Sequence, residues 1–573
     1  MSIMRTGQKW HRMGTRAGGI WYITSTGVYL ALYTISLGPA SRRKSLAAAA
    51  SIVFTAATLL LAAYALSVLA LTILYLWHRS KACERAELTC YPRITVQLPI
   101  YNEVMVVERL IHAITHLDWP REQLEIQVLD DSTDNTTLIL QGWVEYYRAK
   151  GFNIQLLRRE ERDGFKAGAL QMGLQRATGE LIAIFDADFV PGRDWLQKTV
   201  PYFLSCPQLG MLQTRWSHLN REYSLLTRAQ AIALDGHFVV EQTARQRSGL
   251  LFSFNGTAGI WRRECIEQSG GWQSDTLCED MDLSFRAQLA GWKCLYLPDV
   301  TTPSEIPPQL AALKRQQFRW AKGTIQCLLK LGRRVATCSK PWYVRAMALI
   351  HLSAYSVHPL LLLSLLATLP MLLSPPPLSV SPGIVGMFTT SPLLMYAVGQ
   401  IALHGRHWLR HYASLPLLVL LGIGIALNNT RGVLEALFGT NNVFLRTPKF
   451  GLEGDKGKWQ NNPYVLEVDT VTLGELALAL YALASVIVAW HNSYVHIIPS
   501  LLLYAAGFAY VGGMGIWEAS LKPRRRAQSQ VNVLPVQRLV SAAPSEFPSS
   551  YPIASASEYS QSVSQVAQVE HNL

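Results

Sequence analysis

Apolar residues are concentrated towards the two ends of this 573-residue chain. Long apolar stretches lie before residue 78 and after residue 345, whereas the segment between them alternates short apolar runs with amphipathic helical patterns. About twenty consecutive apolar residues are enough to cross a bilayer as a helix. The pattern therefore predicts an integral, multi-pass membrane protein in which spans flank a soluble domain on both sides, with the lipid bilayer as a partner.

The N-terminal spans are expected within 20–77. A moderately apolar stretch covers 20–37, and a longer, more apolar one covers 47–77. Residues 1–19 are polar and basic and are interpreted as a cytoplasmic N-terminus. The basic run 42–44 would then face outward, against the positive-inside tendency. No cleavable signal peptide is evident, because the first apolar run ends in a basic loop without a small-residue cleavage site.

The C-terminal part divides into four regions by the same criterion. We expect a transmembrane region over 346–430, a polar cytoplasmic loop over 431–472, two further spans over 473–520 and a disordered tail over 521–573. The tail is rich in Ser, Gln, Ala and Val and offers little to pack.

The number of spans before the polar loop raises a difficulty. If this loop faces the same side as the soluble domain, an even number of crossings must precede it. Three apolar stretches do so, at 346–373, 384–403 and 412–428. We therefore expect that either the second or the third does not cross completely, and the sequence does not decide which.

The soluble block alternates strand and helix patterns, which predicts an α/β fold with a mainly parallel sheet and helices on both faces. The expected strands are 94–99, 125–129, 153–157, 181–185, 211–214 and 250–254. The expected helices are 104–117, 136–149, 167–177 and 193–204.

Acidic residues follow three of these strands directly. They are Glu103 after the first strand, Asp130 and Asp131 after the second, and Asp186 and Asp188 after the fourth. In parallel α/β sheets, ligands bind at the carboxyl ends of the strands. We therefore expect these residues to meet in one crevice.

The central motif is the segment 180–189, which reads ELIAIFDADF. Its four apolar residues predict a short buried strand that presents Asp186 and Asp188 at its end. Two hard oxygen ligands suit Mg²⁺ or Mn²⁺ together with a diphosphate. The alternative for an isolated pair of this kind is a solvated acidic turn.

For two other candidate site motifs, a purely structural explanation competes with the functional one. Lys166 lies at the start of a helix, where a lysine and free backbone N–H groups can together bind an anion. The structural alternative is an ordinary capped helix start without a ligand. Glu279 and Asp280 open another helix, either to favour its dipole or to supply a general base that deprotonates a hydroxyl.

A basic amphipathic region is expected over 308–345, lying in the membrane interface. Gln316, Arg319 and Trp320 are spaced i, i+3, i+4 and so share one face of its helix. That face would offer a guanidinium for phosphate and an aromatic ring for a sugar, or it is an ordinary interfacial face with Arg and Trp.

Composition narrows the class of partner. The formal net charge of +13 fits anionic lipid headgroups in a membrane protein, and no basic stretch interleaved with aromatics suggests nucleic acid. The eight cysteines form no CxxC pair or zinc spacing, so we expect reduced thiols.

Together, these motifs resemble the processive family-2 glycosyltransferases. That family includes bacterial cellulose synthases, hyaluronan synthases and the plant cellulose synthase-like mannan and xyloglucan-backbone synthases. The resemblance covers roughly 94–450. Its matching segments are LPIYNE (98–103), DDSTD (130–134), FKAGAL (165–170), FDADF (185–189), FNGTAGIWRR (254–263), EDMDLSFRAQLAGWK (279–293), QQFRW (316–320) and FLRTPK (444–449).

The resemblance implies a GT-A catalytic domain over 78–307, inserted between transmembrane helices and facing the cytoplasm of a bacterial plasma membrane or of a eukaryotic Golgi or plasma membrane. The implied activity is an inverting hexosyltransferase that polymerises a β-linked glucan from UDP-glucose and extrudes it. The alternatives are a mannan or glucomannan synthase using GDP-mannose and a lipid glycosyltransferase of the ceramide type. A channel or receptor with a degenerate transferase domain is a non-enzymatic alternative, against which the intact acidic motifs argue.

The resemblance also implies residue roles. Asp130 and Asp131 would bind the base and ribose of a nucleotide-sugar donor, and Lys166 its diphosphate. Asp186 and Asp188 would hold Mg²⁺ or Mn²⁺. Asp280, beside Glu279, would be the general base. Arg319 and Gln316 would stabilise the leaving diphosphate, and Trp320 would stack on the growing polysaccharide acceptor. A gating loop over the nucleotide would contain Phe444, Thr447 and Lys449.

Three departures from the family pattern are visible. Cys278 stands where cellulose synthases usually have Thr, and Arg446 replaces Val within the gating-loop motif. No cyclic-di-GMP-binding domain is recognised after the last span, so we do not expect that regulation. Accessory export subunits are further possible partners.

Overall fold

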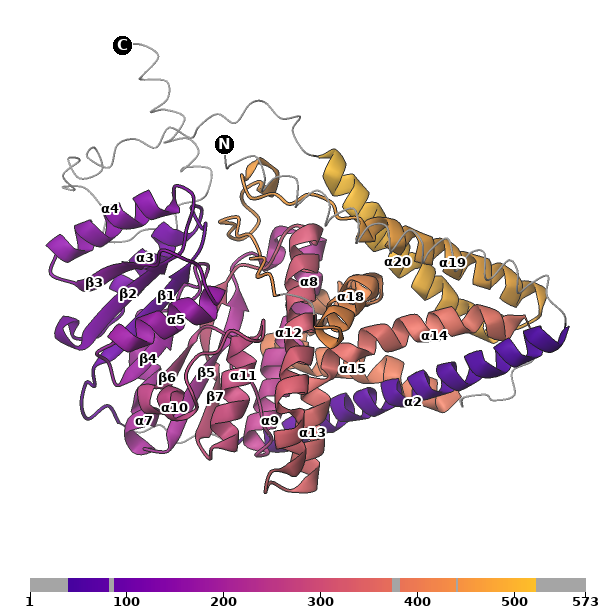
Figure 1. The fold of residues 1–573 in the computed structure, drawn as a ribbon, viewed down its shortest axis with the longest axis horizontal. Helices are drawn as coiled ribbons and strands as arrows, with labels where there is room; N and C mark the ends of the chain where they lie inside the picture. The colour runs from indigo at the N-terminus through magenta and orange to yellow at the C-terminus, as the bar shows by residue number, and fades with distance from the viewer. Residues whose placement is uncertain (1–39, 82–86, 374–381, 440–441, 522–573) are drawn as a thin grey trace, which may run out of the picture.

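The computed structural model describes residues 40–81, 87–373, 382–439 and 442–521, and all structural statements below concern these. The predicted span 20–37, the N-terminus 1–19 and the tail from residue 522 lie outside them. Figure 1 shows a sheet-containing half and a fan of long helices, with one helix, α12 (Leu310–Thr337), running between the two.

The sheet has seven strands in the order β3-β2-β1-β4-β6-β5-β7. β1, β2, β3 and β4 pair in parallel, β6 is antiparallel to both of its neighbours, and β5 is parallel to β7. The predicted α/β fold with a mainly parallel sheet is thus confirmed, and β6 is its antiparallel strand. The strands are β1 (Ile94–Ile100), β2 (Leu124–Asp130), β3 (Asn153–Arg158), β4 (Leu181–Ile184), β5 (Leu209–His218), β6 (Gly259–Arg262) and β7 (Lys293–Ser304).

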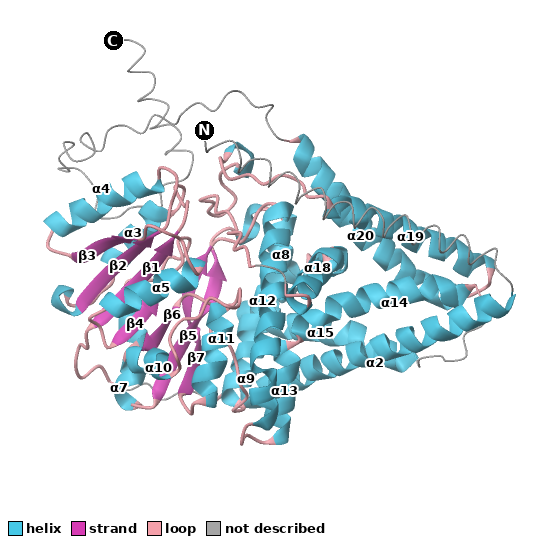
Figure 2. Cartoon of the chain, viewed as in Figure 1, coloured by secondary structure: helices cyan, strands magenta, loops and turns pink. Residues whose placement is uncertain are grey.

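Helices cover both faces of this sheet, as Figure 2 shows. One hydrophobic cluster joins the sheet to α3 (Val107–Thr115), α4 (Thr136–Ala149) and α6 (Trp195–Thr199). A second joins its opposite face to α5 (Phe165–Arg176), α10 (Arg263–Gln268) and α11 (Glu279–Leu289). The central strands are buried on both sides, which is why they read as unbroken apolar runs such as LIAI in β4.

One predicted strand is wrong. Residues 250–254 are buried but do not pair as a strand, because side chains of α11 take their backbone hydrogen bonds. The N–H of Phe254 donates to Ser284 Oγ (2.8 Å), and Gln288 Nε2 donates to the carbonyl of Phe252 (2.7 Å). The chain pairs with β4 only afterwards, through β6. The strand β7 was not predicted, since Pro298 and Pro303 break its pattern; prolines are tolerated there because β7 is an edge strand.

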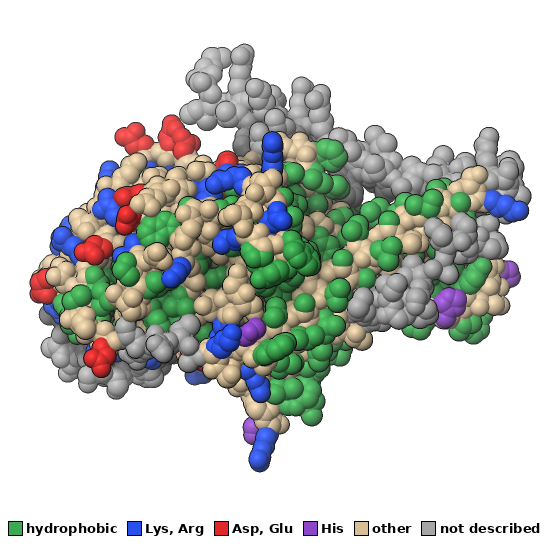
Figure 3. All heavy atoms as spheres, turned by 90° about the horizontal axis from the view of Figure 1, so that it is seen from below, with side chains coloured by type: hydrophobic (Ala, Val, Ile, Leu, Met, Phe, Trp, Pro, Cys, Tyr) green, Lys and Arg blue, Asp and Glu red, His purple; other side chains and the backbone are tan. Residues whose placement is uncertain are grey.

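Among the described residues, four helices are long and apolar enough to cross a membrane. They are Lys44–His78 within α2 (Ala40–His78), Ala354–Leu372 including α14 (Val357–Leu372), Val471–His491, which is α19, and Val495–Ser520 including α20 (Ile498–Ser520). The partly described α15 (Pro382–His404) packs beside α2. In Figure 3 apolar side chains dominate the helical half, and charged ones gather on the sheet half.

The ends of these helices show which ends lie near the sheet half. Glu518, at the end of α20, accepts the N–H of Leu310 (2.8 Å), at the start of α12. Gln400 in α15 donates to Asp235 (2.9 Å), the last residue of α8 (Leu225–Asp235). At the opposite end, Asn492, beyond α19, donates to the carbonyl of Leu372 at the end of α14 (2.7 Å).

The third apolar stretch is bent rather than straight. α17 (Leu415–Gly424) and α18 (Ala426–Leu437) meet at an angle of 44°. Ten residues of helix extend about 15 Å, half of a hydrocarbon core of about 30 Å. α18 then lies along α12, where Asn428 donates to the carbonyl of Lys314 (2.9 Å) and Lys322 pairs with Glu435 (3.2 Å).

The remaining helices are short connectors. They are α7 (Pro201–Ser205), the π-helix Gly236–Gln242, α9 (Thr243–Arg247), α13 (Trp342–Leu352) and α16 (Trp408–Tyr412). The seven described cysteines are all free thiols, as expected.

Candidate functional site

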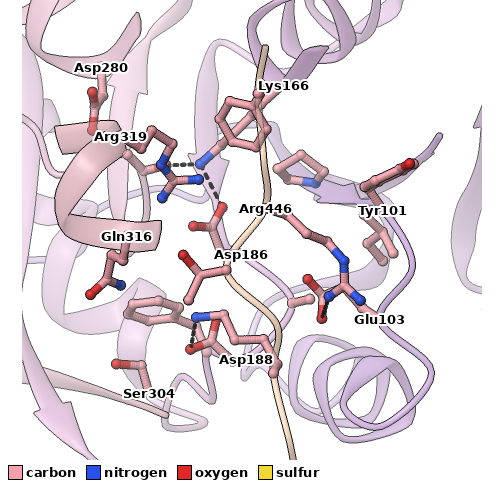
Figure 4. A pocket seen from close by; sticks show the side chains of 18 of the residues that line it. Tyr101, Glu103, Lys166, Asp186, Asp188, Asp280, Ser304, Gln316, Arg319 and Arg446 are labelled. Carbon is pink, nitrogen blue, oxygen red and sulfur yellow. Dashed lines mark hydrogen bonds and ion pairs between the residues drawn. The ribbon is translucent and has the colours of Figure 1, made fainter. Parts of the chain in front are cut away.

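A polar cavity opens at the carboxyl ends of β1, β2 and β4, where the sequence places its acidic residues (Figure 4). Its walls come from the sheet, from the starts of α5 and α11, from one face of α12 and from a loop over residues 442–470. Of the predicted site residues, all but one line this cavity. They are Asp131, Lys166, Asp186, Asp188, Glu279, Asp280, Gln316, Arg319, Trp320, Phe444, Thr447 and Lys449.

The exception is Asp130. This residue is fully buried behind the cavity, where its carboxylate accepts from Thr137 Oγ1 (2.7 Å) and from the N–H of Ser132 (2.9 Å) and pairs with Arg158 (3.0 Å). The hydrogen bond to the N–H two residues on is that of an Asx turn, so Asp130 holds the turn between β2 and α4. Asp131 does reach the cavity and is held there by Arg159, whose Nε donates to Oδ1 (3.0 Å).

Lys166 joins the DxD segment to the loop that follows Phe254. Its Nζ donates to Asp186 Oδ1 (2.6 Å) and to the carbonyl of Gly256 (2.9 Å), and it lies 4.0 Å from Glu279. Burial lowers the pKa of Lys166, but Asp186 and Glu279 more than offset this and raise it above the usual value. A permanently charged lysine is thus fixed in the cavity wall.

Asp188 is almost completely buried and is contacted from two sides. Its Oδ2 accepts from Lys449 Nζ (2.9 Å) and from the N–H of Glu305 (3.1 Å). Its other oxygen, Oδ1, has no hydrogen-bond partner, and neither does Thr447 Oγ1. Asp188 and Thr447 both line the cavity, so these two buried atoms are available to a ligand that enters it.

The residues present fit a divalent cation that also binds a phosphate ligand. Asp186 and Asp188 offer carboxylate oxygens, one of them unpartnered, while the described residues contain no cluster of three or more His, Cys, Asp or Glu that could enclose a metal alone. Mg²⁺ is typically bound by one or two carboxylates plus phosphates and water. The donor set therefore suits a metal held jointly by protein and diphosphate.

Asp280 lines the cavity at the start of α11. Burial and the neighbouring Glu279 raise the pKa of its carboxyl to about 7, with Lys166 acting in the other direction. A carboxyl whose pKa lies near neutrality is suited to accept a proton.

Gly256 allows Asp280 its position. It has φ +82°, and a Cβ at this residue would lie 2.9 Å from Asp280 Oδ2 and 3.4 Å from Lys166 Nζ. Glycine is therefore required both for the backbone conformation and for the space beside the acid and the lysine.

The face of α12 towards the cavity carries Gln316, Arg319 and Trp320, as their spacing predicted. The guanidinium of Arg319 lies 4.7 Å from the centre of the Phe444 ring, which also stacks on Phe165 at 5.8 Å. The helix and the loop 442–470 therefore close over the cavity together.

Five further cavity residues had no role assigned from the sequence, although Glu103 was expected to lie in the crevice. Tyr101 and Arg162 stack at 3.4 Å, and Glu103 pairs with Arg446 (3.1 Å), with burial raising the pKa of Glu103 to about 8. Glu305, beyond β7, is the fifth. The position of Glu103 after β1 signalled it, whereas Arg162 and Glu305 follow no recognised motif and depend on tertiary contacts.

Three comparisons with known proteins bear on this site. The model of a family described as glycosyltransferase-like family 2 matches residues 92–323. A glucomannan 4-beta-mannosyltransferase 7 of Arabidopsis thaliana is 32% identical over 457 residues, 76% of this chain and 80% of that protein. A glucomannan 4-beta-mannosyltransferase 1 of Cyamopsis tetragonoloba is 40% identical over 269 residues, 46% of this chain and 50% of that protein.

The match to several relatives is partial, since the chain spans about half the length of the Cyamopsis protein and 43% of a relative from Oryza sativa. Among solved structures, a mannosyltransferase of Pyrobaculum calidifontis in complex with GDP-Man and Mn²⁺ has a TM-score of 0.45 and 23% sequence identity. That alignment covers 70% of this chain and 100% of the other.

Proposed function

Since the chain belongs to the family-2 glycosyltransferases of the cellulose synthase-like group, we propose that it is a membrane-embedded mannosyltransferase that builds a β-linked polysaccharide from GDP-mannose. The main support for a transferase function is that one cavity is lined by Asp186, Asp188, Lys166, Asp280 and Trp320. These residues come from the end of β4 and from three helices, α5, α11 and α12, which a solvated turn or an ordinary helix cap would not bring together.

The choice of mannose rests on the relatives. Their names describe glucomannan 4-beta-mannosyltransferases, which favours the mannan alternative over the UDP-glucose donor expected first from the motifs. The glucan reading has no comparable support, and a lipid acceptor has none either. We therefore take a mannan or glucomannan as the product class.

In this proposal the donor lies along the sheet edge. Tyr101, Glu103 and Asp131 line the end of the cavity suited to the base and ribose, and Lys166 and Lys449 would neutralise the diphosphate. The lysines are already held by Asp186 and Asp188, so a donor would meet preoriented charges.

When bound, Mg²⁺ or Mn²⁺ at Asp186 and Asp188 would supply positive charge to the diphosphate. On the protein side, Asp280 accepts the proton of the acceptor hydroxyl. The acceptor oxygen forms its bond to the anomeric carbon while the bond from that carbon to the diphosphate oxygen breaks. Arg319 and Gln316 then stabilise the charge that develops on the leaving diphosphate.

A single displacement of this kind inverts the anomeric carbon and gives a β-linkage from an α-linked donor. A single displacement needs a base, here Asp280, and no carboxylate nucleophile. Asp186 and Asp188 are paired with lysines instead. Trp320 would stack on the terminal sugar of the acceptor, since sugars present apolar faces to aromatic rings.

The helix ends support a cytoplasmic catalytic domain with the product leaving between the spans. α14 runs away from the sheet half, and α15 returns to Asp235. In this proposal α14 and α15 are the two crossings before the loop 442–470. We do not count α17 and α18, although this bent pair is together long and apolar enough for one span, because α17 alone is too short and α18 lies along α12. This arrangement supplies the even number that a cytoplasmic loop requires.

The proposal is tested by incubating the purified full chain in detergent with radiolabelled GDP-mannose or UDP-glucose and Mg²⁺ or Mn²⁺. We expect metal-dependent transfer of mannose into a polymer, abolished by EDTA, and little transfer of glucose. Exclusive transfer of glucose would replace the donor assignment, and the absence of transfer from both donors would contradict the proposal.

A further inference from the structure

We propose that Glu305 is a positioning residue that seats the loop 442–470 over the donor. It does so by presenting a buried carboxylate to consecutive backbone N–H groups of that loop. The proposal rests on the transferase function above, which supplies the donor. Glu305 directly follows β7 and is 5% exposed.

Three successive amides converge on this one side chain. The N–H of Phe450 donates to Oε1 (2.8 Å), and those of Gly451 and Leu452 donate to Oε2 (2.8 and 3.3 Å). Successive N–H groups that face one point form a concave anion-binding arrangement. Here the anion is part of the protein and comes from the edge strand of the sheet.

The conformation of the loop is specific to this contact. Gly451 has φ +72°, the left-handed conformation that turns its N–H towards the same side as its neighbours. The flanking side chains of Phe450 and Leu452 are buried in a small cluster with Ala312 of α12 and Trp459. The loop is thus anchored by its backbone on Glu305 and by its side chains on α12.

Glu305 also contacts the proposed metal site. Its own N–H donates to Asp188 Oδ2 (3.1 Å), and Lys449, which immediately precedes the three amides, donates to the same oxygen (2.9 Å). The position of the loop and the orientation of Asp188 are therefore set by the same residue. A shift of the loop relative to Glu305 would also displace Lys449 from the donor site.

No cation takes the place of these amides. Among the described residues, no Lys, Arg or His nitrogen lies within 4.0 Å of the Glu305 carboxylate. A buried carboxylate is costly unless its hydrogen bonds are satisfied, and removing the loop would take away these three backbone donors and leave only the longer-range charge of Arg109. The seated loop is favoured for this reason.

The test compares Glu305→Gln with Asp455→Asn in the full-length protein. Glutamine keeps the volume but turns an NH₂ group towards the amides. Asp455 is an exposed carboxylate of the same loop and serves as the matched control. We expect the KM for GDP-mannose to rise roughly tenfold in Glu305→Gln, with kcat changed far less, and no change in the control.

A second measurement does not depend on catalysis. Trypsin cleavage at Lys456 and Lys458, both exposed in the loop, should be faster in Glu305→Gln than in wild type. If Glu305→Gln does not fold, Gly451→Ala disturbs the same contact from the loop side, since its Cβ would lie 3.0 Å from the carbonyl of Met105.

The outcomes separate the two proposals. An unchanged KM together with unchanged cleavage in Glu305→Gln would overturn the role of Glu305. If wild type transfers no sugar, the transferase proposal fails. The cleavage rates still decide whether Glu305 holds the loop.

Discussion

At the scale of single residues, the proposed transfer depends most on Asp280. Burial and Glu279 raise the pKa of this carboxyl to about 7, against the effect of Lys166. A general base works only when deprotonated, so the transfer rate should fall as the pH drops through about 7, approaching tenfold per pH unit. A pH–rate profile of the wild type checks this, and a rate that stays constant down to pH 5 would contradict it.

The same residue is tested by substitution. Asp280→Asn removes the proton acceptor but keeps the shape of the side chain, so we expect kcat to fall by roughly 100-fold or more. Binding of the donor, measured by calorimetry, should stay nearly the same because Asp280 is not placed on the nucleotide. Equal turnover in the mutant and the wild type would remove Asp280 from its role.

Gly256 gives a second prediction at this scale. Gly256→Ala places a methyl group 2.9 Å from Asp280 Oδ2, whereas Gly249→Ala has a similar φ of +68° but open space around it. Both changes carry the strain of a positive φ, about 1 kcal/mol or more. Only the first should abolish transfer, as measured by labelled sugar incorporation at matched thermal stability. Equal activity of the two variants would show that Gly256 does not shape the site.

The sequence predicts most of these residues because their types follow strand and helix ends. Asp186, Asp188 and Asp280 are acids directly after buried apolar runs or at a helix start, and the spacing of Arg319 and Trp320 places them on one helix face. Asp130 illustrates the limit. Asp131 reaches the cavity, but the side chain of Asp130 points away from it because Thr137 and Arg158 bind its carboxylate.

At the scale of elements, α12 carries the acceptor side of the site. Trp320→Ala should raise the KM for an added manno-oligosaccharide acceptor roughly tenfold, the value of an aromatic contact of about 1.4 kcal/mol. Trp320→Phe keeps a ring and should retain most of the affinity. An equal KM in Trp320→Ala and wild type would place the acceptor elsewhere.

Elements with strong periodicity were predicted well, and those defined by long-range pairing were not. The amphipathic helix expected from residue 308 is α12, and the buried runs at 94–99 and 181–185 are β1 and β4. Residues 250–254 have the composition of a strand, but Ser284 and Gln288 bind their backbone instead. Such competition between side chains and strand partners is not visible in local sequence.

At the scale of the whole molecule, the helix ends predict a topology. Val443 should lie on the side of the catalytic domain, and Ser493, beyond α19, on the opposite side. In sealed vesicles with the catalytic domain outward, an impermeant maleimide should label Val443→Cys but not Ser493→Cys, with the exposed Cys90 replaced by Ser in both. Labelling of both positions from one side would contradict the proposed crossings.

The central claim is that this fold joins mannose residues by β-linkages. Digestion of the polymer made by the purified chain from GDP-mannose and Mn²⁺ with an endo-β-1,4-mannanase tests it most directly. We expect release of labelled manno-oligosaccharides from the wild-type polymer and no product from Asp280→Asn. A polymer that resists this enzyme but is cleaved by an endo-β-1,4-glucanase or an α-mannosidase would contradict it.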